Sequence, residues 1–236
     1  MTGLLVSVTD RSEAEIALDV GVDILDIKNP AEGALGQLPL EAVAEIAALA
    51  KGRCKTSATI GDLPMQPDLV AAAATAMTET GVDIVKIGFF GTAHHEACAK
   101  ALYQAVGGRA GLVAVLMADQ TPDPGLIPAL QKHGFYGVML DTATKHGKHL
   151  LDYFDIEELQ VFCSQAKRHG LISGLAGSLK NTHVEVLAHL NAGYLGFRGA
   201  ICFGGNRNAE LDANKLLLIK SLLQKNNINC LLPQKA

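Results

Sequence analysis

Two lysines occupy similar places in two similar apolar segments. Lys28 ends the run Gly21-Val-Asp-Ile-Leu-Asp-Ile-Lys28, and Lys86 lies in the run Gly81-Val-Asp-Ile-Val-Lys-Ile-Gly88. An ammonium group among apolar neighbours is costly unless it is paired with an anion or becomes neutral. A neutral lysine amine is a nucleophile that can condense with a carbonyl group. The matched Gly-Val-Asp-Ile openings therefore indicate two copies of one structural unit, each delivering a lysine to a shared place.

Carboxylates accompany these lysines. Asp26 precedes Lys28 by two positions, so both side chains face the same side of a strand, and Asp141 ends another apolar run. Two ammonium groups held close together lower the pKa of one of them, and a nearby carboxylate can orient or protonate the reacting partner. The alternative is that Lys28 and Lys86 are ordinary strand-end residues, neutralised by Asp26 and Asp141.

Two glycine-rich segments form a second candidate site. They are Gly174-Leu-Ala-Gly-Ser-Leu-Lys180 and Gly196-Phe-Arg-Gly-Ala-Ile-Cys-Phe-Gly-Gly-Asn-Arg207. Glycines let backbone N–H groups approach phosphate oxygens, and Arg198 or Arg207 could add a bidentate contact. The segments could also be simple turns. The predicted phosphate-binding residues are Gly177, Ser178, Arg198, Gly199, Gly204 and Gly205.

Strand-like and helix-like segments alternate along the chain and would position these residues. We expect eight strand–helix units in a single (β/α)8 TIM barrel of class α/β, since such barrels typically have about 250 residues and no G-x-G-x-x-G motif follows Val8. The barrel domain is expected over 1–225, with a C-terminal tail over 226–236. Lys28, Lys86 and Asp141 would then meet at the carboxyl end of the barrel, where active sites of this fold lie. The expected strands are Leu4–Val8, Ile24–Lys28, Thr56–Ile60, Ile84–Phe89, Leu112–Met117, Val138–Leu140, Leu171–Leu175 and Leu195–Arg198.

Composition excludes several functional classes. Hydrophobic residues make up 49% of the chain and charged residues 19%, which predicts a packed core. A net charge of -4 gives no indication of nucleic-acid binding, and there is neither a membrane-spanning apolar run nor a signal peptide. The five cysteines lack C-x-x-C spacing, and the histidines lack the spacing of metal ligands. We therefore expect a cytoplasmic protein with reduced thiols, no metal and no cofactor, in a homo-oligomer of undetermined size.

The motifs around these residues resemble one family from Leu4 to about Leu223. That family is (5-formylfuran-3-yl)methyl phosphate synthase, also called 4-(hydroxymethyl)-2-furancarboxaldehyde phosphate synthase, of methanofuran biosynthesis. The segments that carry the resemblance are Asp26-Ile-Lys-Asn-Pro-Ala-Glu-Gly-Ala-Leu-Gly36, Ser57-Ala-Thr-Ile-Gly-Asp62, Val85-Lys-Ile-Gly88, Met139-Leu-Asp-Thr-Ala-Thr-Lys-His-Gly-Lys148, Leu175-Ala-Gly-Ser-Leu-Lys180 and Arg198-Gly-Ala-Ile-Cys-Phe-Gly-Gly-Asn-Arg207.

The resemblance implies a lyase that condenses two molecules of glyceraldehyde 3-phosphate with loss of phosphate and water. It implies that Lys28 is the Schiff-base lysine and Lys86 the proton acceptor, supported by Asp26, Asp141 and Lys145. Neither a metal nor an organic cofactor is implied. Two alternatives remain: a class I aldolase that stops at carbon–carbon bond formation, and a non-catalytic phosphosugar-binding barrel.

Overall fold

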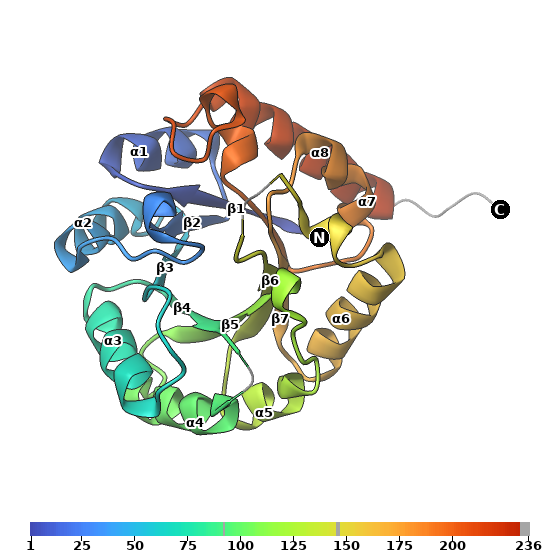
Figure 1. Ribbon diagram of the computed structural model, residues 1–236. Coiled ribbons are helices and arrows are strands. Elements are labelled where there is room, and N and C mark those ends of the chain that lie inside the picture. The colour runs from blue at the N-terminus through green and yellow to red at the C-terminus, as the bar shows by residue number, and fades with distance from the viewer. Residues whose placement is uncertain (92, 145–146, 232–236) are drawn as a thin grey trace.

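Eight parallel strands close into a barrel in the computed structural model, which describes residues 1–91, 93–144 and 147–231 (Figure 1). Each strand pairs with the next along the chain, and β8 pairs with β1. The predicted (β/α)8 TIM barrel is therefore confirmed. The strands are β1 (Gly3–Val8), β2 (Ile24–Ile27), β3 (Lys55–Thr59), β4 (Ile84–Phe89), β5 (Gly111–Met117), β6 (Gly137–Asp141), β7 (Ile172–Leu175) and β8 (Tyr194–Phe197).

Helices connect the strands and form the outer ring of the molecule (Figure 1). Short 3-10 turns follow several strands at the carboxyl end of the barrel, including η5 (Gly199–Ile201) and η6 (Phe203–Gly205) after β8. The α-helices are α1 (Arg11–Val20), α2 (Leu40–Ala50), α3 (Pro67–Glu79), α4 (His95–Val106), α5 (Leu126–Lys132), α6 (Ile156–Arg168), α7 (Val184–Ala188) and α8 (Ala213–Leu231).

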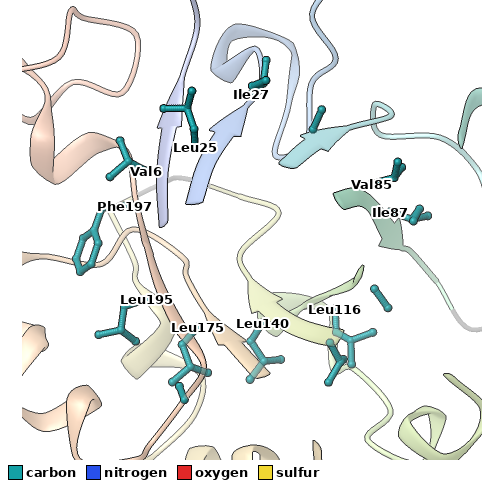
Figure 2. Packing of buried hydrophobic residues seen from close by; sticks show 14 of the residues in the cluster. Val6, Leu25, Ile27, Val85, Ile87, Leu116, Leu140, Leu175, Leu195 and Phe197 are labelled. Atoms are coloured by element: carbon teal, nitrogen blue, oxygen red, sulfur yellow. The ribbon is translucent and has the colours of Figure 1, made fainter. Parts of the chain in front are cut away.

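Alternation along each strand separates two apolar clusters. Successive strand side chains point to opposite faces, so Val6, Leu25 and Val85 point outward and pack beneath the helices (Figure 2). The neighbouring Leu5 and Ile84 point inward and fill the barrel. Inward positions nearer the carboxyl end include the charged side chains of Asp26, Lys86 and Asp141, which belong to the candidate site.

Three side chains close the opposite, N-terminal end of the barrel. Lys55 Nζ donates a hydrogen bond to the Tyr136 hydroxyl at 2.9 Å, and its ammonium lies 5.0 Å from the centre of the Tyr136 ring. Tyr136 and Tyr194 are both partly buried and pack against the inner apolar cluster. The interior is therefore covered by aromatic side chains at this end.

Two predicted helix ends are wrong. The pattern Ser12-Glu-Ala-Glu predicts a capping box that opens the first helix at Ser12, but Asp10 caps α1 and accepts a hydrogen bond from the Glu13 N–H at 3.0 Å. The sequence pattern predicts a last helix over Asn214–Lys225, whereas α8 continues to Leu231 and buries Asn226. The expected boundary between barrel and tail, at 225/226, therefore falls inside α8. No helix among the described residues is long and apolar enough to cross a membrane.

Candidate active site

A cavity of about 590 Å³ opens at the carboxyl end of the barrel. This volume lies within the range of about 300–1,000 Å³ found for small-molecule sites. Its lining includes Asp26 and Lys28 from β2 and the residue after it, Lys86 from β4 and Asp141 from β6. The structure thus brings together the four side chains that the strand assignment placed at one end of the barrel.

Asp26 and Lys86 form a fully buried ion pair at the bottom of this cavity. Lys86 Nζ lies 2.9 Å from Asp26 Oδ1, and the two side chains are 2% and 0% exposed. The Ser57 hydroxyl donates to the same carboxylate at 2.6 Å and the Ser7 hydroxyl at 2.9 Å. Burial alone would raise the pKa of Asp26, but the charges of Lys86 and Lys28 and the hydrogen bonds from Ser57 and Lys86 hold that pKa below its usual value. Asp26 is therefore a carboxylate at neutral pH.

Lys28 pairs with the other carboxylate. Its Nζ lies 3.8 Å from Asp141 Oδ2 and donates a hydrogen bond to the Ala34 carbonyl at 3.4 Å. Asp141 Oδ1 accepts a hydrogen bond from the Thr142 N–H at 2.7 Å. Although Asp26 is only two residues from Lys28, it bonds to Lys86 on β4, while Lys28 reaches β6. Each lysine is thus paired with a carboxylate, as expected if both were ordinary strand-end residues. However, both lysines face the same cavity.

Asp62 positions the loop that contacts Lys28, a role that sequence reasoning did not assign. Its two carboxylate oxygens accept hydrogen bonds from the backbone N–H groups of Ala34 at 3.0 Å and Leu35 at 2.9 Å. The carbonyl of Ala34 is the one that accepts from Lys28. The sequence signal that could have indicated this role is the position of Asp62 just after the third expected strand, at the barrel end where the lysines were expected.

The loop after β7 carries free backbone donors. Gly177 has a φ of 103° and Ser178 a φ of 50°, which is uncommon for a residue other than glycine. Among the described residues, no acceptor bonds to the N–H groups of Gly177, Ser178 or Gly199, and all three residues line the cavity. These donors are available to an anion. In contrast, the Gly205 N–H donates to the Cys202 carbonyl at 3.1 Å, and Gly204 is outside the described cavity lining.

Arg198 holds the loop after β8 in place. Its guanidinium is buried against Glu13 of α1, and it also donates to the carbonyls of Arg207 at 2.7 Å, Ala209 at 3.0 Å and Ser7 at 3.2 Å. These contacts occupy the side chain that we expected to bind phosphate. Arg198 therefore shapes the loop, although it also borders the cavity.

Arg207 is the more available arginine. It is half-buried, and its Nη2 donates to the Gly33 carbonyl in the loop after β2 at 2.7 Å. Burial lowers the pKa of Arg207, and the charge of Asp141 opposes this shift. An arginine nevertheless stays cationic at neutral pH.

The described cavity lining is cationic, although the whole chain carries a net charge of -4. Its cationic side chains are Lys28, Lys86, Lys180, Arg198 and Arg207. Asp26 and Asp141 in the lining, and Glu13 behind Arg198, balance some of these charges, and the remaining positive charge suits an anionic substrate. No group of metal-binding side chains occurs among the described residues. Lys145, predicted as a supporting catalytic residue, lies outside the described residues.

A comparison with known families identifies the family of this chain. The family model for 4-HFC-P synthase matches residues 4–220, which contain every described residue discussed above for the cavity. The chain belongs to the 4-HFC-P synthase family. It is therefore an enzyme.

Relatives of this 4-HFC-P synthase family member extend over almost the whole chain. The (5-formylfuran-3-yl)methyl phosphate synthase of Methanothermobacter thermautotrophicus is 37% identical over 231 residues, covering 93% of this chain and 98% of that protein. The enzyme of the same name from Methanopyrus kandleri is 37% identical over 217 residues, covering 87% and 91%. A protein of Methylorubrum extorquens is 42% identical over 215 residues, covering 90% and 88%.

Solved structures share the fold of this 4-HFC-P synthase family member at low sequence identity. Phosphoribosyl anthranilate isomerase from Thermus thermophilus superposes with a TM-score of 0.67 at 14% identity, covering 95% of this chain and 99% of that one. The 3-hexulose-6-phosphate synthase from Salmonella typhimurium superposes with a TM-score of 0.63 at 18% identity, covering 95% and 100%. At these identities the likeness shows the barrel fold alone.

Proposed function

We propose that this enzyme condenses two molecules of glyceraldehyde 3-phosphate into (5-formylfuran-3-yl)methyl phosphate, with loss of phosphate and water, through a Schiff base on Lys28. The observation that carries the proposal is the pair of lysines in one cavity, each beside its own carboxylate. The names of the relatives from Methanothermobacter thermautotrophicus and Methanopyrus kandleri support this product, and the resemblance of the motifs implies a place in methanofuran biosynthesis. The cationic cavity suits a phosphorylated triose.

Lys28 begins the reaction. Its amine passes a proton to Asp141, whose Oδ2 lies 3.8 Å away, and attacks the aldehyde carbon of the first triose. The carbinolamine that forms must then lose its hydroxyl group as water. Lys86 supplies the proton for this step, because its ammonium form is the one that pairs with the Asp26 carboxylate.

Lys86 becomes a base only after it has given up that proton. Its neutral amine takes a proton from the carbon next to the imine, and the imine accepts the electron pair. The resulting enamine carbon attacks the aldehyde of the second triose and forms the carbon–carbon bond. Elimination of phosphate, loss of water and ring closure then give the furan. Lys145 keeps its predicted supporting role in these steps.

Borohydride trapping tests this assignment. Reduction in the presence of glyceraldehyde 3-phosphate should attach a label to Lys28, located by peptide mass spectrometry. Lys28→Arg should give neither label nor product, because a guanidinium stays protonated and forms no imine. Lys86→Arg should lose product while Lys28 is still labelled, because the nucleophile is intact.

Other outcomes separate the competing mechanisms. A label on Lys86 in the unmodified protein would reverse the two roles. An unlabelled protein, together with a Lys28→Arg variant that still makes the furan, would rule out covalent catalysis. A class I aldolase would give a labelled lysine without release of inorganic phosphate or furan absorbance.

A further inference from the structure

The proposed reaction requires places for two phosphate groups, and only one of these groups is released. The N–H groups of Gly177, Ser178 and Gly199 are backbone donors available to one phosphate. Backbone donors of this kind do not move away during the reaction, so they suit the phosphate that the product retains. The departing phosphate needs another cation.

Most cationic side chains of the described cavity lining already have other roles. Lys86 is bonded to Asp26, and Lys28 contacts Asp141 and is the proposed nucleophile. The Arg198 guanidinium is occupied by Glu13 and by three backbone carbonyls. Lys180 is exposed to solvent. Arg207 is half-buried, and the one hydrogen bond described for its side chain goes to the Gly33 carbonyl.

Arg207 connects the loop after β8 with the loop after β2. Its backbone belongs to the loop after β8, where Arg198 Nε donates to the Arg207 carbonyl at 2.7 Å. Its Nη2 reaches the Gly33 carbonyl at 2.7 Å, in the loop after β2 that also contacts Lys28 through Ala34. Among the described residues, no acceptor bonds to the other N–H groups of this guanidinium.

We infer that Arg207 binds the departing phosphate and stabilises the charge that develops on it. This inference rests on the proposed function. In the elimination, Lys86 is a base again because its ammonium form has protonated the alkoxide left by carbon–carbon bond formation. It takes a proton from the carbon next to the one that bears the departing phosphate, and a double bond forms between these two carbons. The carbon–oxygen bond to phosphate breaks, and its electron pair passes to the phosphate oxygen. The guanidinium donates two N–H groups to that phosphate and transfers no proton, since its own pKa is too high. The Gly33 carbonyl is its partner after phosphate has gone.

Arg207→Gln and Arg207→Lys test the inference, with Arg53→Gln as the matched control. Arg53 is an exposed arginine that pairs with Asp19 outside the cavity. With glyceraldehyde 3-phosphate, Arg207→Gln should release phosphate about 10²-fold more slowly, as expected when a donor to a developing anion is lost. Arg207→Lys should lie between this variant and the unmodified protein, because it keeps the charge without the planar fork. Arg53→Gln should be unaffected.

Lys28 labelling by borohydride separates phosphate binding from a merely structural role. If Arg207 only held the loop after β2 in place, labelling of Lys28 would fall together with phosphate release, which would overturn the inference. We expect labelling to persist in both Arg207 variants. Phosphate release by Arg207→Gln at the rate of the unmodified protein would also overturn it.

Inorganic phosphate provides a readout that does not depend on turnover. Crystals of the unmodified protein soaked in phosphate should show one anion at Gly177 and Ser178 and a second at Arg207, and Arg207→Gln should lose only the second. An unchanged second anion in that variant would refute the role of Arg207. Failure of the unmodified protein to make furan would instead refute the proposed function, whatever the crystals show.

Discussion

At the scale of single residues, Asp26 connects three neighbouring parts of the barrel interior. Its carboxylate accepts hydrogen bonds from Ser7 of β1, Ser57 of β3 and Lys86 of β4. Removing one partner of a buried ion pair leaves an uncompensated charge, which costs far more than the intact pair contributes. The arrangement therefore makes the stability of the fold depend on a residue of the candidate site.

Replacing Asp26 with Asn tests this dependence. The amide keeps the shape of the side chain but leaves the Lys86 ammonium buried without its counter-ion, so the free energy of unfolding at pH 7 should fall by about 3–5 kcal/mol. Urea denaturation measures the change. A variant as stable as the unmodified protein would show that Lys86 is neutral in the folded state.

The same variant should change the pH dependence of stability. Because folding lowers the pKa of Asp26 from its usual 3.8, its contribution to stability is complete above that value and is lost as the pH falls through the lower, folded-state pKa. The unmodified protein should therefore lose stability below about pH 4 more steeply than Asp26→Asn. Thermal unfolding of both proteins between neutral and acidic pH measures the two slopes.

At the scale of elements, a buried ion pair fastens the loop after β8 to α1. Glu13 Oε2 contacts Arg198, and Glu13 Oε1 accepts a hydrogen bond from the Leu211 N–H at 3.1 Å. The side chains of Glu13 and Arg198 are only 5% and 8% exposed. We expect Glu13→Gln and Arg198→Met each to destabilise the protein by about 3–5 kcal/mol, and the double variant to lose less than the sum of the two. A double-mutant cycle by urea denaturation checks this; additive losses would contradict it.

The loop after β7 offers a matched glycine pair. Gly177 and Gly52 both have positive φ, at 103° and 77°, so alanine should cost each site about 1–2 kcal/mol. A Cβ at Gly177 would also lie 2.9 Å from Thr142 Cγ2, whereas a Cβ at Gly52 meets nothing within 4 Å. Gly177→Ala should therefore raise KM for glyceraldehyde 3-phosphate, and Gly52→Ala should not. Equal KM values in steady-state assays would argue against an anion site at Gly177.

Elements were easier to predict from the sequence than side-chain partners. Five strands have a local signal, an apolar run after a turn glycine such as Gly21 or Gly81, so the barrel and the convergence of Lys28, Lys86 and Asp141 followed largely from local patterns. The partner of Arg198 had no such signal, because Glu13 is 185 positions away. The two arginines of the glycine-rich loop therefore looked equivalent until the fold showed which one was occupied.

At the scale of the whole molecule, the two ends of the described chain meet beside the N-terminal face of the barrel. The Thr2 N–H donates to Asn227 Oδ1 at 2.9 Å, and Asn227 Nδ2 donates to the Thr2 carbonyl at 2.9 Å. Asn227→Ala removes both bonds and should cost about 1–3 kcal/mol. Because the cavity opens at the other end, kcat should stay unchanged. Asn214→Ala, at an exposed position of the same helix, is the control, and a fall in kcat specific to Asn227→Ala would contradict the separation.

The closed lower end of the barrel also affects the order of events. Lys55, Tyr136 and Tyr194 cover the interior at that end, so molecules come and go through the mouth above Lys28 and Lys86. In a cavity with one opening, a molecule that enters later must leave before one that entered earlier. In the proposed reaction, the triose joined to Lys28 enters first, and the second triose then lies between it and the opening. We therefore expect phosphate held by the half-buried Arg207 to depart before the furan, whose release from the buried Lys28 frees the enzyme for the next turnover.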